Sequence, residues 1–199
     1  MSEDDHAVVV FDRDSRTGTL RQKRGSKGCI SQDGAHGCAN GTALQGAGSV
    51  AVSRDGRNVY VASHGSNAVA VFDRDASGAL TQKVGPAGCA SDSATRGDCT
   101  KAKALLNPQS VTVSRDGRSV YVLSEGSNAL TVFDRDPRGR LKLKRGLRGC
   151  LSDDGTPYRG ASRCVDSAAN RRRLKRRRRQ PRRQERVRRV SRKRRASRS

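Results

Sequence analysis

The sequence predicts an all-β fold built from repeated units, and three observations support that prediction. Short segments rich in valine recur along the chain, and residues that favour turns separate them. Hydrophobic residues make up only 33% of the 199 residues and aromatic residues 3%, while glycine occurs 21 times. Such a composition suits many short strands better than long helices. The third observation is an internal repeat, which decides the architecture.

The repeat has a period of 61 residues. The pentapeptide Val-Phe-Asp-Arg-Asp begins at Val10, Val71 and Val132, so that each start lies 61 positions after the previous one. A second motif, Val-Ser-Arg-Asp-Gly-Arg, begins at Val52 and again one period later at Val113. Because both motifs keep the same spacing, we infer that one structural unit is repeated along the chain.

One unit contains four candidate strands. Turn residues bound each of them; in the first turn we expect Asp55 to shape the chain ahead of Gly56. The four segments are Ser49–Ser53, Asn58–Ser63, Ala68–Asp73 and Leu80–Val84. Four antiparallel strands followed by a long connection, here residues 85–109, are typical of a β-propeller blade. We expect Phe72 and Phe133 to fill the space between neighbouring blades, and Tyr60 and Tyr121 to be packing residues as well, each with a hydroxyl that reaches an edge.

The whole chain predicts a partial β-propeller of about two and a half four-stranded antiparallel blades over residues 1–170. The N-terminus supplies only the last two strands of a blade, Ala7–Asp12 and Leu20–Arg24. The predicted units are a half blade at 7–28, a blade at 49–88 and a blade at 110–149, with cysteine-containing loops between them. Two broad blade faces would then lie uncovered, so we expect the chain to associate with itself through them.

The repeated motifs resemble those of a known family. Both full units have Ser-x-Asp-Gly, then Val-Tyr-Val, then Asn-Ala-x-x-Val-Phe, as Ser53, Tyr60 and Phe72 illustrate. This order resembles the YVTN and lactonase-type seven-bladed propellers of bacteria, over about residues 7–164. The resemblance implies a truncated propeller, and it concerns strand and turn positions rather than reacting groups. The family includes phosphogluconolactone-cleaving lactonases, muconate-lactonizing relatives and surface proteins without an assigned reaction, so fold alone does not select among them.

Six cysteines occur as one pair in each connection between units. The pairs are Cys29 with Cys38, Cys89 with Cys99, and Cys150 with Cys164. Because each connection holds its own pair, we predict three local disulfides, each worth on the order of 2–3 kcal/mol. Structural zinc is an alternative that normally needs the tighter Cys-x2–4-Cys spacing, and reduced cysteines are another.

Disulfides imply an oxidising compartment, so the parent protein is predicted to be extracellular or periplasmic. No signal peptide is visible, because the start is acidic and the apolar run Ala7–Phe11 is short. A longer parent protein would reconcile the two observations. No apolar run approaches the length that spans a membrane, so we expect no membrane insertion.

Candidate reactive residues are few. His64 and Glu125 follow the second strand of successive units, one period apart, on the rim that also carries the cysteine loops. They are the candidate catalytic residues, as an acid–base pair, and solvated turn residues are the alternative. The segment Asp-x-Asp-x-Ser-Gly that begins at Asp73 resembles the opening of a calcium loop, but Val84 stands where a bidentate glutamate is required. We therefore predict no metal, and the absence of phosphate-loop and nucleophile-elbow motifs predicts no cofactor.

The last segment, residues 171–199, does not follow the repeat. It holds 16 Arg and 2 Lys against one Glu, a net charge of +17 out of the +23 of the whole chain. A segment of this composition is predicted to be disordered and to bind polyanions or nucleic acid without sequence specificity. Alternatively, it is an out-of-frame translation, a hypothesis favoured because the switch interrupts a unit within a loop.

These observations predict the function only in outline. The leading hypothesis is an incomplete lactonase-like propeller segment that serves as a non-catalytic repeat or binding scaffold. One alternative is a phosphogluconolactonase-like lactone hydrolase whose remaining blades are missing. Binding of polyanions through the basic tail is a second alternative.

Overall fold

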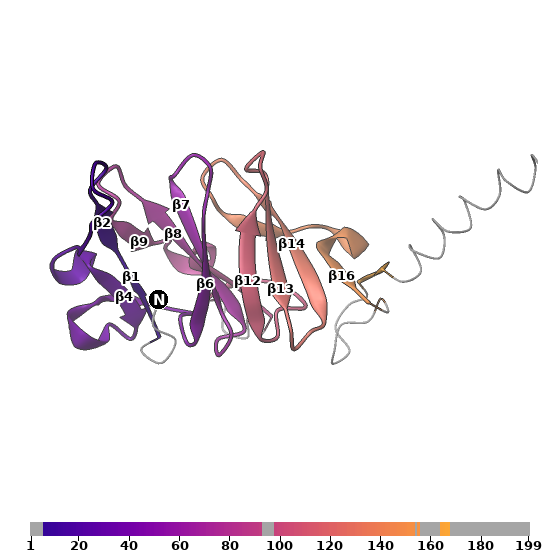
Figure 1. Ribbon diagram of the computed structural model, residues 1–199. Coiled ribbons are helices and arrows are strands. Elements are labelled where there is room, and N and C mark those ends of the chain that lie inside the picture. Colours follow the sequence, from indigo (N-terminus) through magenta and orange to yellow (C-terminus); the bar gives the residue numbers. More distant parts are fainter. Residues whose placement is uncertain (1–5, 93–97, 154, 156–163, 168–199) are drawn as a thin grey trace, which may run out of the picture.

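The computed structural model describes residues 6–92, 98–153, 155 and 164–167 and confirms an all-β partial propeller (Figure 1). The tail predicted for residues 171–199 lies outside the described residues. In Figure 1 the sheets stand side by side in chain order, with the N-terminal strands at one end and β16 near the other. Among the described helices, none is long and apolar enough to cross a membrane.

The first full blade, called here the first blade, is one sheet of six strands. Strands β6, β7 and β8 pair antiparallel in chain order. Strands β9 and β10 both pair with β8, one along each half of it, and β11 runs parallel to β10. The strands are β6 (Ala47–Val52), β7 (Asn58–Ser63), β8 (Ala68–Arg74), β9 (Leu80–Gln82), β10 (Cys89–Ser91) and β11 (Thr100–Lys101).

The second full blade, called here the second blade, has the same topology one period later. Strands β12, β13 and β14 pair antiparallel, β15 and β16 share the far edge of β14, and β17 runs parallel to β16. The strands are β12 (Pro108–Val113), β13 (Ser119–Ser124), β14 (Ala129–Arg135), β15 (Leu141–Leu143), β16 (Cys150–Ser152) and β17 (Val165–Asp166). The sequence repeat therefore reproduces the pairing scheme strand by strand.

The N-terminal strands form the outer part of a third blade, called here the partial blade. Strands β1 and β2 together correspond to β8, since β1 pairs with β4 and β2 with β3. Strand β5 runs parallel to β4, as β11 does to β10. The strands are β1 (Ala7–Val9), β2 (Phe11–Arg13), β3 (Leu20–Gln22), β4 (Cys29–Gln32) and β5 (Ala39–Gly41).

The outer edge of each blade differs from the simple fourth strand that the sequence predicted. Strand β9 ends at Gln82, two residues before the predicted end, and Val84 is 93% exposed. The chain then turns at Gly85, whose φ of +62° favours glycine, and returns to the same edge as β10. Short 3-10 helices make these turns and the similar turn before β5: η1 (Gly25–Lys27), η2 (Ala35–Gly37), η3 (Gly85–Gly88) and η4 (Gly146–Gly149).

Three cysteine pairs lie at bonding distance along this outer edge. Each joins the first residue of one edge strand to the residue just before its parallel neighbour, with Cα atoms 4.7–4.8 Å apart. The pairs are Cys29–Cys38, Cys89–Cys99 and Cys150–Cys164. The segments treated as loops in the sequence therefore belong to the sheets, and a sulfur bridge closes each of them.

Two hydrophobic clusters fill the junctions between blades. Val8 and Ile30 of the partial blade meet Val59 and Phe72 of the first blade. The other face of the first blade packs in the same way on the second, where Phe133 is fully buried. The expectation that these phenylalanines fill the space between blades is confirmed. At the inner edge β6 lies beside β12, where the Val111 backbone N–H donates to Ser49 Oγ at 3.2 Å.

Candidate functional site

His64 and Glu125 lie at equivalent turns of the first and second blades, each immediately after its blade's second strand. The backbone N–H of His64 donates to the Gly46 carbonyl at 3.0 Å, and that of Glu125 donates to the Asn107 carbonyl at 3.0 Å. Gly46 and Asn107 belong to the connections between blades. The structure therefore places both candidates on the rim formed by these turns and the connections.

The two side chains contact different connections. The His64 ring lies directly over Gly46, because a Cβ built on that glycine would stand 2.2 Å from Nε2. Glu125 Oε2 accepts hydrogen bonds from the side-chain amides of Asn107 and Gln109, at 3.5 and 3.4 Å. Each candidate is thus held against the connection leading into its own blade.

A third residue of this rim, His6, escaped the sequence analysis. Its Nδ1 accepts a hydrogen bond of 3.0 Å from the Gly46 backbone N–H, and this contact joins the partial blade to the first blade. His6 therefore reaches the same glycine over which His64 lies. The repeat offered no signal for it, because His6 corresponds to Asn67 one period later and an asparagine again at 128.

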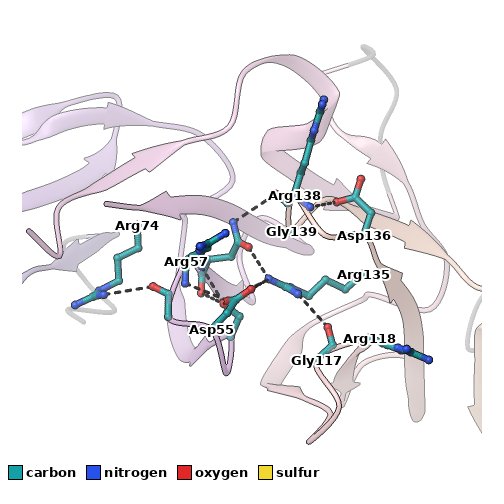
Figure 2. Close-up of polar contacts among 12 residues, drawn as sticks. Asp55, Arg57, Arg74, Gly117, Arg118, Arg135, Asp136, Arg138 and Gly139 are labelled. Carbon is teal, nitrogen blue, oxygen red and sulfur yellow. Dashed lines mark hydrogen bonds and ion pairs between the residues drawn. The ribbon is translucent and has the colours of Figure 1, made fainter. Parts of the chain in front are cut away.

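The most extensive polar cluster lies on the opposite rim and joins the first and second blades (Figure 2). At its centre is Arg135, at the end of β14, with a side chain only 7% exposed. Its Nη2 contacts Asp55 Oδ2 at 3.0 Å and Asn58 Oδ1 at 2.7 Å, and its Nε donates to the Tyr60 hydroxyl at 2.8 Å. The guanidinium is also held within its own blade, because Nη1 donates to the Gly117 carbonyl at 3.1 Å.

Asp55 has both the turn role that the sequence predicted and a role between blades. Its Oδ1 accepts hydrogen bonds from the Ser53 hydroxyl at 2.5 Å and from the Arg57 backbone N–H at 3.1 Å. These bonds shape the turn between β6 and β7. The Ser53 hydroxyl, assisted by the Arg57 N–H and the Arg135 guanidinium, lowers the pKa of Asp55 to about 2. The carboxylate therefore stays charged at neutral pH.

Tyr60 completes the connection from the first blade to the second. Its hydroxyl donates to the Gly139 carbonyl at 2.9 Å, in the turn between β14 and β15. The side chain is fully buried, and burial raises the pKa of Tyr60 to about 12. The sequence predicted a packing residue whose hydroxyl reaches an edge. The structure shows that the hydroxyl bonds to the neighbouring blade.

The Asp-x-Asp carboxylates are occupied by local contacts. Asp73 pairs with Lys83, and Asp75 accepts hydrogen bonds from the Ser77 hydroxyl at 2.7 Å and the Ala79 backbone N–H at 2.9 Å. These bonds close the turn between β8 and β9. Nearby, the corresponding turn of the second blade borders an open depression of about 390 Å³, whose lining is Asp134, Arg135, Asp136, Arg140, Leu141 and Lys142.

Successive antiparallel sheets that pack face to face around a shared inner edge place this protein in the β-propeller class. The family model "Lactonase, 7-bladed beta-propeller" matches residues 1–146. The chain therefore belongs to the seven-bladed lactonase propeller family. The comparison with curated proteins finds no match.

Three solved structures share the fold. A proposed 6-phosphogluconolactonase from Bacteroides fragilis is 20% identical with a TM-score of 0.52, covering 71% of this chain and 33% of that one. Another from Bacteroides uniformis is 19% identical with a TM-score of 0.51, at 71% and 34% coverage. A protein from Lactobacillus plantarum is 23% identical with a TM-score of 0.51, at 71% and 35% coverage. This chain spans about one third of the length of these structures, and the likeness concerns the fold.

Proposed function

We propose that this chain is a non-catalytic scaffold segment of a lactonase-like propeller whose parent protein is secreted. The proposal rests on the role of the polar side chains at the junction between the first and second blades. Arg135, Asp55 and Tyr60 bind one another across a blade junction. Their pKa values are displaced away from neutral pH, whereas a general acid or base works best with a pKa near the operating pH. This cluster therefore suits joining blades better than transferring protons.

The rim that carries His64 and Glu125 supports the same proposal. An acid–base pair must reach one substrate together, within hydrogen-bond distance of the atoms that exchange protons. Here His64 lies over Gly46, and Glu125 binds the amides of Asn107 and Gln109. Both side chains support the connections that lead into their blades.

The cysteine pairs support a secreted parent. All three blades carry a pair at the same place on the outer edge, and no cysteine of this chain lies outside these pairs. Disulfides persist in extracellular and periplasmic compartments, whereas the cytosol keeps thiols reduced. We therefore place the parent protein in an oxidising compartment.

A lactone hydrolase completed by further blades is the second candidate function. The family match favours it, and two of the solved structures with this fold are described as proposed 6-phosphogluconolactonases. Since this chain spans about a third of their length, a hydrolytic site of that kind would draw on blades beyond those described here.

Lactone hydrolysis distinguishes the two candidates. We expect the purified chain to open 6-phosphogluconolactone no faster than buffer alone, followed by acid release at constant pH. Acceleration would contradict the proposal and favour the hydrolase if His64→Gln or Glu125→Gln abolished it. The matched control is His36→Gln, which changes an exposed histidine of η2 away from both candidates.

A further inference from the structure

The second blade presents an open apolar face whose counterpart in the first blade is covered. Leu123 is 53% exposed and Leu151 36% exposed, although both are large hydrophobic residues. Tyr121, Leu130 and Val132 share this face by the strand alternation and are half-buried. The equivalent residues of the first blade, one period earlier, are all fully buried: Tyr60, Ala62, Val69, Val71 and Ala90.

The repeat shows what covers such a face. In the first blade, the residues named above belong to one hydrophobic cluster with Phe133 and Leu141 of the second blade. Arg135 adds the polar contact at the rim, where it binds Asp55 and Tyr60. A covering blade therefore brings a phenylalanine and an arginine from its third strand and a leucine from the strand that follows.

The partial blade offers these three residues, and all of them are exposed. Phe11 is 48% exposed and Leu20 61% exposed, whereas Phe133 and Leu141 are buried. Arg13 is exposed and pairs in register with Leu20, as Arg135 pairs with Leu141. The partial blade thus presents outward the same side chains, in the same register, that the second blade uses to cover the first.

The second blade also repeats the polar receptor for such an arginine. Asp116 accepts hydrogen bonds from the Ser114 hydroxyl at 2.5 Å and the Arg118 backbone N–H at 3.1 Å, the bonds that hold Asp55. Asp116 is exposed, and the carboxylate of Asp55 additionally binds Arg135. Opposite charges therefore lie at the matching corners of the two open faces.

We propose that a second copy of this chain covers the open face of the second blade with its partial blade. Phe11 and Leu20 of one copy pack on Tyr121, Leu123 and Val132 of the other, and Arg13 reaches Asp116. The contact is head-to-tail, so a pair of copies keeps one open face of each kind, and assembly continues until it closes into a ring or grows as a filament. This proposal goes beyond the scaffold role and does not depend on whether the chain hydrolyses lactones.

Sedimentation velocity of the full, oxidised chain over a range of concentrations tests this contact. We expect reversible association, weakened at least about tenfold by Leu123→Glu or Phe11→Glu, because each replaces a large apolar contact with a charge. Val84→Glu is the matched control, since Val84 is 93% exposed and lies on neither face. Strand content by circular dichroism shows that each variant is folded, and Leu151→Glu supplies a second change on the same face.

A mixing experiment tests the polarity of the contact. Phe11→Glu leaves the second-blade face intact, and Leu123→Glu leaves the partial-blade face intact. An equimolar mixture should therefore form a heterodimer through one native contact, while each variant alone stays monomeric. Arg13→Asp should also weaken association, whereas Arg74→Asp, the same change one period later, should not. A monomeric wild-type chain, unaffected single variants, or a mixture without heterodimer would each overturn the proposal.

Discussion

Equivalent arginines in the first and second blades show how much a neighbouring blade contributes. Arg135 and Arg74 occupy equivalent positions in the repeat, and each donates from Nη1 to a glycine carbonyl of its own blade, at 3.1 and 3.3 Å. Only Arg135 meets a turn of the preceding blade. Its side chain is 7% exposed and binds Asp55, Asn58 and Tyr60, whereas Arg74 is exposed and points away from that cluster (Figure 2). The same residue is thus a junction residue in one copy and a surface residue in the next.

The burial of two equivalent phenylalanines, Phe133 and Phe11, differs in the same way. Phe133 is buried between two complete blades, and Phe11 is 48% exposed on the partial blade. In repeat proteins, stability comes largely from contacts between neighbouring units. Equivalent substitutions in different units should therefore have very different effects, and the predictions below measure the difference.

The largest effect is expected from Phe133→Ala. Truncating a buried phenylalanine leaves a cavity and should reduce the free energy of unfolding by about 3–5 kcal/mol. Phe11→Ala should cost less than about 1 kcal/mol, because that side chain is half exposed. Urea unfolding, at a concentration low enough for the chain to be monomeric, measures both. Equal costs would show that the partial blade is as well covered as the full junction.

Removal of one disulfide should have the next largest effect. The double substitution Cys89→Ser and Cys99→Ser should reduce stability by about 2–3 kcal/mol, because the closed loop no longer restricts the unfolded chain. Mass mapping of the oxidised wild-type protein should find only the three local crosslinks. Crosslinks between different blades, or bound zinc with six free thiols, would contradict this pairing.

A smaller effect is expected at the polar junction. Arg135→Met should reduce stability by about 1–2 kcal/mol, since Tyr60 loses a partner and Asp55 is half exposed and can bind water instead. Arg74→Met is the matched change and should stay within about 0.5 kcal/mol. Thermal unfolding of the two variants side by side gives the difference. A larger loss for Arg74→Met would mean that the junction contacts do not stabilise the chain.

Alkaline pH tests the burial of Tyr60. The unfolded state loses the tyrosine proton near pH 10, whereas the folded state keeps it up to about 12. The unfolded state then binds fewer protons, so stability should fall as pH rises from 10 to 12, by about 1 kcal/mol at pH 11. Tyr60→Phe should remove this part of the decline. Urea titrations at pH 9 and pH 11 give the loss of unfolding free energy for the wild-type chain and for Tyr60→Phe. An identical loss in both would argue against a buried hydroxyl.

Removal of residues 171–199 should affect stability least. We expect unchanged strand content, because none of the described strands lies in that segment. Salt-sensitive binding to DNA should be lost, since +17 of the net charge of +23 lies there. Titration of a labelled duplex at two salt concentrations measures this. Equal affinity of the truncated chain at low salt would place the basic surface on the propeller.

The repeat allowed much of the fold to be predicted, because a period carries information that single strands do not. It located β7 and β8, and the equivalent strands β13 and β14 of the next unit, to within about one residue. It also predicted that Phe72 and Phe133 are buried. It could not predict β10, β11 and β17, since strands of two or three residues show no alternation of polar and apolar side chains.

The junction residues were hidden for a different reason. Arg135 binds Asp55, which lies 80 positions earlier and belongs to another unit, so no local motif relates them. Each arginine of the Val-Phe-Asp-Arg-Asp motif also looks like an ordinary charged strand end. Its recurrence at 13, 74 and 135 was the available signal. The repeat put His64 and Glu125 at equivalent turns, but their separate contacts with the connections depend on geometry that a sequence does not carry.

The sulfur bridges at the outer edge also have a consequence for how this protein can change over evolutionary time. The bridged cysteines are 9, 10 and 14 positions apart, while the strands on either side keep the same pairing. The number of residues between the bridged cysteines therefore varies while the strand pairing does not, and each doubling of such a loop costs only about 0.6 kcal/mol in closure entropy. These sites can therefore accept new sequence, including a grafted peptide epitope, without shifting the strands behind them.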